Sequence, residues 1–118
     1  MLDSFKVETQ ERDSVWVLRT HGYINNVGGE KIARTFDEIF TTGGRRFLFN
    51  LEGSKIINSI GVSYLIEILE KILDCNGELA FCNCAPIIEK TFKIMGITQY
   101  AKIYASAETA IGAMGNTT

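Results

Sequence analysis

Apolar and polar residues alternate in a short stretch near the start of the chain, a second short stretch is a mainly apolar run, and apolar residues then recur at helical spacing. Residues 5–9 alternate large apolar with polar side chains, residues 15–20 form a second run rich in strand-favouring residues, and the polar residues 10–14 between them form the connection. These two stretches predict an antiparallel hairpin. In residues 30–40 the apolar side chains lie three and four positions apart, which predicts an amphipathic helix that starts after the flexible pair Gly28-Gly29.

Short apolar runs and longer amphipathic segments alternate through the rest of the chain. Three more short runs predict strands, at residues 46–51, 78–82 and 102–104. Three more amphipathic segments predict helices, at residues 59–76, 86–96 and 107–114. Local signals support the helix ends: Asn76-Gly77 is typical of a helix C-terminus, Pro86 suits a first turn, and Ser106 suits an N-cap.

The order of the predicted elements is β-β-α-β-α-β-α-β-α. Strands that are separated by a helix run parallel through right-handed crossovers, whereas the opening hairpin adds an antiparallel strand. We therefore expect an α/β fold with a mixed, mainly parallel β-sheet of about five strands and packed helices. No internal repeat, low-complexity segment or long linker divides the sequence, so residues 1–118 are expected to form a single domain.

Composition narrows the class of protein. The chain has 118 residues, of which 46% are hydrophobic, and a formal charge of −2, which suits one small globular domain. It contains no run of Lys and Arg, so we expect no nucleic-acid partner. No apolar stretch approaches the roughly 18 residues of a membrane span, and the N-terminus lacks the layout of a signal peptide. We therefore expect a cytoplasmic protein without direct membrane insertion.

Residues that could carry out chemistry are few. His21 is the only histidine, so a catalytic triad would depend on it alone, and no glycine-rich nucleotide motif occurs. Cys82 and Cys84 lack the paired spacing of a zinc site and, two positions apart on a strand, should share one face as buried thiols. We therefore expect no enzyme, no metal and no cofactor. A thiol or metal sensor that uses Cys75, Cys82 and Cys84 is an alternative, and a small-ligand sensor is another.

The segment at residues 47–62 carries the most specific signal. It runs from a buried strand across a short loop to Ser59 at the start of a long helix. Its sequence Asn58-Ser59-Ile60-Gly61-Val62 resembles Asp-Ser-x-Gly-[Leu/Val], the hallmark of the STAS domain family, which includes the anti-sigma-factor antagonists. His21-Gly22-Tyr23-Ile24-Asn25 is similar to the Gly-x-[Leu/Ile]-Asp that follows the second strand in this family. Both matches have Asn where the family has Asp, and the order of elements is similar throughout.

The resemblance implies a non-enzymatic regulatory protein of bacterial type. In that family the serine that matches Ser59 is phosphorylated by a partner serine kinase, an ATP-binding protein of histidine-kinase-like fold that is also an anti-sigma factor. The unphosphorylated form captures this kinase, and a separate phosphatase resets the switch. The alternative within the family is a subunit or scaffold that works without phosphorylation, such as one bound to the ATPase of a lipid-trafficking ABC transporter.

Reasoning from the residues gives Ser59 two compatible roles. At a helix N-terminus, a phosphate on Ser59 would lie beside free backbone N–H groups and the positive end of the helix dipole. The hydroxyl also suits an ordinary N-cap. Ser63 lies one turn further along the same helix face and is a second candidate phosphoacceptor.

A partner-binding surface is expected around this helix start. Ile56 and Ile57 cannot both point into one core if the loop is extended, so one of them is expected on the surface. Asn25 and Asn58 are expected near the same rim of the sheet, where they ease the approach of a phosphate, remove groups that a kinase needs, or serve as turn residues with unusual backbone angles. The predicted partner-binding residues are Asn25, Ile56, Ile57, Asn58, Ser59, Ile60, Gly61 and Ser63.

Overall fold

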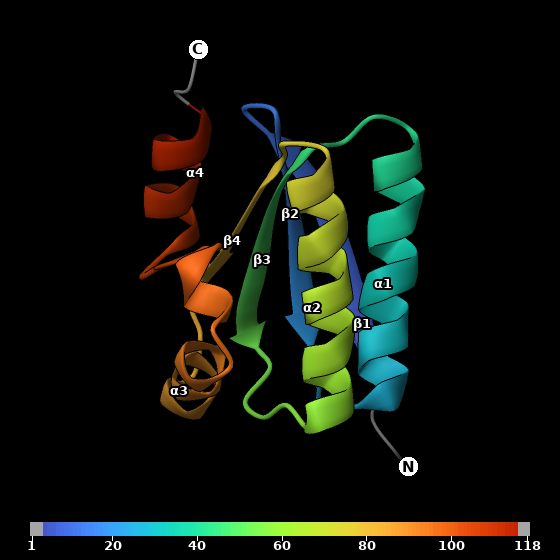
Figure 1. The fold of residues 1–118 in the computed structure, drawn as a ribbon, viewed down its shortest axis with the longest axis vertical. Helices are drawn as coiled ribbons and strands as arrows, with labels where there is room; N and C mark the ends of the chain where they lie inside the picture. Colours follow the sequence, from blue (N-terminus) through green and yellow to red (C-terminus); the bar gives the residue numbers. More distant parts are fainter. Residues whose placement is uncertain (1–3, 116–118) are drawn as a thin grey trace.

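A computed structural model of the chain describes residues 4–115 and leaves residues 1–3 and 116–118 outside the description (Figure 1). Within the described range the chain forms five strands, four α-helices and one 3₁₀-helix. The strands are β1 (Lys6–Arg12), β2 (Val15–His21), β3 (Arg46–Gly53), β4 (Glu78–Cys82) and β5 (Lys102–Tyr104). The helices are α1 (Asn26–Thr41), α2 (Ser59–Asp74), α3 (Pro86–Ile94), the 3₁₀-helix η1 (Ile97–Gln99) and α4 (Ala107–Gly115). The order confirms the predicted succession of strands and helices, to which the structure adds η1.

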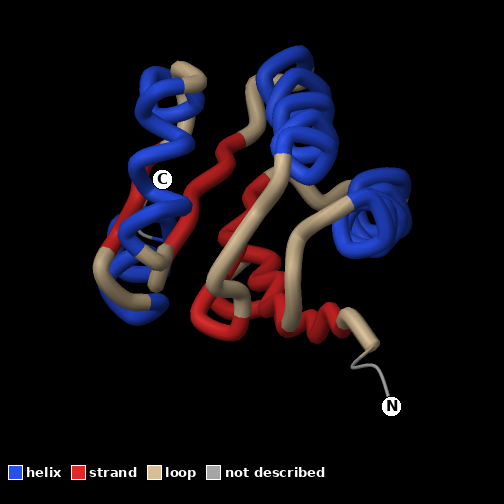
Figure 2. The backbone as a smooth tube through the Cα atoms, turned by 90° about the horizontal axis from the view of Figure 1, so that it is seen from below, coloured by secondary structure: helices blue, strands red, loops and turns tan. Residues whose placement is uncertain are grey.

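The strands form one sheet in the order β1-β2-β3-β4-β5. β1 is antiparallel to β2, and all the other neighbouring strands are parallel, so the predicted mixed sheet is confirmed. Because crossovers between parallel strands are right-handed, a strand order that advances in one direction places α1, α2 and α3 on one face. α4 packs on the other face, and Figure 2 shows helices on both sides of the strands. The carboxyl ends of β2 and β3 therefore lead into α1 and α2 at the same end of the sheet.

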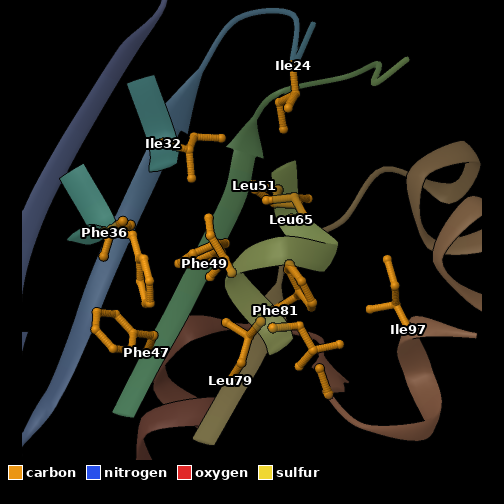
Figure 3. Close-up of a cluster of buried hydrophobic side chains, with 14 of the residues drawn as sticks. Ile24, Ile32, Phe36, Phe47, Phe49, Leu51, Leu65, Leu79, Phe81 and Ile97 are labelled. Carbon is orange, nitrogen blue, oxygen red and sulfur yellow. The ribbon is translucent and has the colours of Figure 1, made fainter. Parts of the chain in front are cut away.

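Each face of the sheet carries its own hydrophobic cluster. On the side of α1, α2 and α3, aromatic rings from strands and helices pack together (Figure 3). The ring centroids of Phe36 and Phe47 lie 4.8 Å apart, and those of Phe81 and Phe92 lie 4.6 Å apart. The buried residues of the second cluster, under α4, are Val15, Val17, Leu48, Ala80, Cys82, Ala110, Ile111 and Met114. Successive residues of one strand thus supply opposite faces, as the alternation of side chains along a strand dictates.

The connection between β1 and β2 is shorter than the sequence pattern predicts. β1 continues to Arg12, which pairs with Val15, so only Asp13 and Ser14 form the turn. Both turn residues have positive φ, +52° and +67°, as a two-residue hairpin turn requires. The predicted polar connection at residues 10–14 is therefore wrong for residues 10–12. These three side chains are exposed on an edge strand, where backbone pairing rather than hydrophobic alternation forms the strand.

Cys82 and Cys84 pack on opposite sides of the sheet. Cys82 is buried in the cluster under α4, whereas Cys84 packs against the cluster of the other face. Asn83, between them, has a φ of +57°, so the chain has left the strand and the two-residue period no longer applies. The prediction that they share one face is therefore wrong. Burial raises the pKa of both thiols to about 12, while Cys75 is exposed after the end of α2.

Candidate functional site

The connections that lead into α1 and α2 are joined by backbone hydrogen bonds. Ile24 and Ile57 form a parallel bridge between the two connections. The Ile24 N–H donates to the Ile56 carbonyl at 3.1 Å, and the Asn58 N–H donates to the Ile24 carbonyl at 3.2 Å. The bridge holds the N-termini of both helices at one end of the sheet, at the bottom of Figure 1. We call the surface formed by residues 23–28 and 55–63 the rim.

Asn25 and Asn58 both lie at the rim, and each is the N-cap of the helix that follows it. The Asn25 side-chain oxygen accepts a hydrogen bond from the Gly28 N–H at 3.0 Å, and the Asn58 side-chain oxygen accepts one from the Gly61 N–H at 2.9 Å. Both asparagines have a φ of −108°, so the explanation that they tolerate unusual backbone angles is wrong. The interpretation of Ser59 as an N-cap is also wrong, because Asn58 occupies that position.

Ser59 is the first residue of α2, and it is exposed. Two of the four N–H groups that begin the helix have acceptors: the Asn58 N–H binds the Ile24 carbonyl, and the Gly61 N–H binds the Asn58 side chain. Among the hydrogen bonds of residues 4–115, none uses the N–H groups of Ser59 or Ile60, as is usual in a first turn. The first turn also contains no acidic residue. An anion attached to Ser59 would therefore meet free donors and the positive end of the helix dipole.

Three glycines allow the two helices to approach the rim and each other. A Cβ on Gly61 would lie 2.1 Å from the Ile24 carbonyl oxygen, and a Cβ on Gly29 would lie 2.4 Å from the Tyr64 ring. A Cβ on Gly28 would lie 2.7 Å from the Tyr23 carbonyl oxygen. Gly28 and Gly29 lie inside α1, which begins four residues before the predicted start at residue 30. They serve close packing, and Gly61 is buried, so it shapes the rim from within.

Apolar side chains are exposed around Ser59. Ile56 is 52% exposed and Ile60 is 49% exposed, whereas Ile57 is half-buried and packs against the core. The expectation that one of Ile56 and Ile57 lies on the surface is therefore confirmed, and Ile56 is that residue. Sequence reasoning missed two further members of this surface, Tyr23 and Val27, which are 44% and 50% exposed. An exposed apolar surface of this kind suits protein–protein contact.

Ser63 is exposed one turn after Ser59, but its hydroxyl is already engaged. It donates to the Ser59 carbonyl at 3.0 Å. Ser63 is also beyond the first turn, where the backbone N–H groups take part in the helix. Of the two predicted phosphoacceptors, Ser59 alone lies beside free N–H donors.

The only histidine of the chain forms a hydrogen bond on the hairpin. His21 lies 3.1 Å from a carboxylate oxygen of Glu8, and this hydrogen bond lowers the pKa of Glu8. Within residues 4–115, no group of three or more His, Cys, Asp or Glu residues is arranged to hold a metal ion. In the same part of the chain, no helix has both the length and the apolar character needed to cross a membrane.

Comparison with known proteins places this chain in one family. The family model of the STAS domain matches residues 6–110. The chain is 22% identical to BtrV of Bordetella bronchiseptica, named among the anti-sigma factor antagonists, over 92% of this chain and 93% of BtrV. A solved anti-sigma factor antagonist from Mycobacterium paratuberculosis matches 94% of each chain with a TM-score of 0.83 at 17% identity. Unphosphorylated SpoIIAA, another such antagonist, matches 97% of this chain and 100% of its own with a TM-score of 0.76 at 19% identity. Because the family model covers nearly the whole chain, this protein belongs to the STAS domain family.

Proposed function

We propose that this protein is an anti-sigma factor antagonist that binds its partner through the rim and is released by phosphorylation of Ser59. The partner is an anti-sigma factor that also acts as a serine kinase, and a phosphatase restores the binding form. The family and the names of the similar proteins support this class of function. The observation that carries the proposal is the exposed Ser59 hydroxyl at the start of α2, with the exposed side chains of Ile56 and Ile60 nearby in sequence.

SpoIIAA supports a switch of this kind because its structure is known in an unphosphorylated and a phosphorylated form. This chain matches the two forms with TM-scores of 0.76 and 0.74, at 19% and 21% identity. The fold that this chain shares with SpoIIAA therefore persists when phosphate is attached to that protein. We infer that phosphorylation of Ser59 likewise leaves this fold intact.

The physical basis of the switch is a difference between folding and binding. A phosphate adds about −1.5 to −2 charges, which the free N–H groups of Ser59 and Ile60 can accept at no cost to the fold. A partner that packs over Ile56 and Ile60 must instead desolvate or repel that charge. A coupling free energy of about 3 kcal/mol corresponds to a change in affinity of roughly 150-fold. Phosphorylation is therefore expected to abolish binding while the protein stays folded.

Asn25 and Asn58 change the charge of the rim without changing its geometry. In each cap, the side-chain oxygen accepts the helix N–H that an aspartate oxygen would accept. Compared with the family motifs, which have Asp at these two positions, the rim therefore has two carboxylates fewer, and the starts of both helices are still capped. We infer that an incoming phosphate meets less repulsion here, and that a partner contacts these two positions through amide hydrogen bonds.

The test compares four immobilised baits in lysate of the source organism: the wild type, Ser59→Ala, Ser59→Glu and the matched control Ser63→Glu. Wild type, Ser59→Ala and Ser63→Glu are expected to retain the same ATP-binding serine kinase, and Ser59→Glu is expected to lose it. Addition of ATP should release the kinase from wild type and leave it on Ser59→Ala. Mass spectrometry of the released wild-type protein should place the phosphate on Ser59.

Two results would contradict the proposal. If wild type and Ser59→Glu hold the same partner equally, binding does not depend on charge at Ser59, and a scaffold subunit that works without phosphorylation explains the data better. If ATP leaves a phosphate on Ser59→Ala, the phosphoacceptor is a different residue.

A further inference from the structure

A second apolar surface lies away from the helix N-termini, between the later turns of α2 and the end of α3. It is a groove of about 350 Å³. We call it the α2–η1 groove, and its lining residues are Ile66, Leu69, Glu70, Leu73, Met95, Gly96, Ile97 and Tyr100. Residues of α2 line one side of it, and the segment from Met95 to Tyr100, which includes η1, lines the other. Leu73, Met95 and Tyr100 are 40%, 53% and 62% exposed, so this groove is an open apolar surface.

A protruding apolar side chain stands next to the groove. Ile94, the last residue of α3, is 72% exposed, which is more than any other large apolar side chain of residues 4–115. It precedes Met95, which lines the groove, and the chain then turns at Gly96 with a φ of +80°. Burial of such a side chain is favourable, so an apolar protrusion beside an apolar groove suits contact with the same surface of another copy.

The α2–η1 groove and the protruding Ile94 lie beside charged residues of opposite sign. Glu70 is the only charged residue that lines the groove, and no ion pair within residues 4–115 involves it. Lys90 lies one helical turn before Ile94, on the same side of α3, and likewise has no ion-pair partner among these residues. The neighbouring lysines differ, because Lys71 and Lys93 are each 3.2 Å from a carboxylate of their own chain.

We propose that the α2–η1 groove binds a second copy of this chain in a two-fold symmetric dimer. In such a dimer each surface patch meets its own copy, so Ile94 of each protomer enters the groove of the other. We place Lys90 of each protomer against Glu70 of the other, so that the two-fold axis repeats this ion pair and both charges gain a partner. A partner of another kind would need to supply this combination of a basic group and an apolar side chain by itself.

The proposed dimer leaves the rim free. Glu70 lies about 16 Å along the axis of α2 from Ser59, since each helical residue advances about 1.5 Å. The dimer would therefore present two copies of Ser59 and its surroundings at once. This inference concerns a different surface from the proposed phosphorylation switch, and either one can fail without the other.

Sedimentation velocity over a concentration series up to the millimolar level tests the dimer. Wild type is expected to approach twice the mass of one chain as its concentration rises. Glu70→Lys and Lys90→Glu should each raise the dissociation constant by about tenfold or more, because each creates two repulsive pairs. The control Glu38→Lys makes the same charge change on the exposed part of α1 and should not alter dimerisation.

A mixture of the two charge variants gives the decisive result. Glu70→Lys chains carry two lysines at the interface and Lys90→Glu chains carry two glutamates, so an equimolar mixture should form a heterodimer with both pairs restored. The double variant Glu70→Lys/Lys90→Glu should dimerise like wild type. A wild type that stays monomeric throughout the series overturns the proposal and leaves the groove for an apolar segment of another protein. A dimer that neither charge reversal weakens overturns it too, because the interface then lies elsewhere.

Discussion

Replacement of Gly61 by alanine is expected to destabilise the protein by forcing α2 away from the rim. A Cβ at this position would lie 2.1 Å from the carbonyl oxygen of Ile24 and 2.9 Å from its carbonyl carbon. Both are backbone atoms, and the bridge to Ile57 holds them in place. No side-chain rotation can relieve the contact, so either α2 shifts or the bridge opens.

The magnitude follows from three contributions. Overpacking at a tight site costs about 1–3 kcal/mol. Loss of the hydrogen bond from the Asn58 N–H to the Ile24 carbonyl costs about 1 kcal/mol more. Alanine returns up to about 1 kcal/mol because it favours the helix over glycine. The free energy of unfolding should therefore fall by about 2 kcal/mol, which lowers the urea midpoint by about 1 M.

Urea unfolding followed by circular dichroism measures this change, and Gly112→Ala is the matched control. Gly112 lies in α4, where a Cβ would meet no atom within 4 Å. The same substitution there should stabilise the protein by about 0.5–1 kcal/mol, since only helix propensity changes. If Gly61→Ala unfolds at the wild-type urea concentration or above it, the approach of α2 to Ile24 is not tight and the reasoning is refuted.

Three further predictions concern the caps and the thiols. Asn58→Ala should lower the free energy of unfolding by about 1 kcal/mol, because the cap is lost. Asn58→Asp should keep the cap and raise the free energy of unfolding by about 0.3–1 kcal/mol at low salt, because a carboxylate interacts favourably with the helix dipole. Urea unfolding measures both changes, and equal losses of stability in the two variants would contradict the cap. The folded-state pKa of Cys82 and Cys84, about 12, lies above the ordinary value of 9.0, so the unfolded chain loses thiol protons first. Stability should be unaffected by these thiols below pH 9.0 and should fall as the pH rises from there toward 12, and a Cys82→Ala/Cys84→Ala variant should show a weaker decline in urea midpoint over that range. Thiol labelling of the folded protein near pH 8 should modify Cys75 rapidly and the buried Cys82 and half-buried Cys84 slowly, so Cys75→Ser should remove the fast phase; a fast phase that persists would contradict the shielding of the other two thiols.

The order of strands and helices could be predicted because burial produces it. The unbroken apolar run in residues 15–18 indicates a strand that is buried on both faces, and apolar residues at helical period in residues 59–76 report which side of that helix faces the core. Element ends set by local polar geometry were harder to predict. The start of α1 depends on the cap at Asn25 and on glycines inside the helix, and the hairpin turn depends on left-handed Asp13 and Ser14.

The site could be predicted in outline because Asn25 and Asn58 each follow a parallel strand, and such strand ends meet at one edge of a sheet. The role of each residue within the site was harder to predict from the sequence. Asn and Ser are both good N-caps, so the sequence does not decide between Asn58 and Ser59. Tyr23 and Val27 were missed because large apolar residues are ordinarily expected in the core, whether in a connection or in the first turn of a helix.

The bridge between Ile24 and Ile57 also restricts the lengths of two loops. One residue added to the connection before α1, or to the connection before α2, would break the pairing and displace the start of both helices. The connection after α1 takes no part in this bridge, because the N–H groups of Thr42, Gly43 and Gly44 donate to carbonyls at the end of α1. Related chains are therefore expected to accept insertions at that opposite end and to keep both rim loops at constant length. Alignments of distant relatives can be anchored on these two loops before any residue identity is compared.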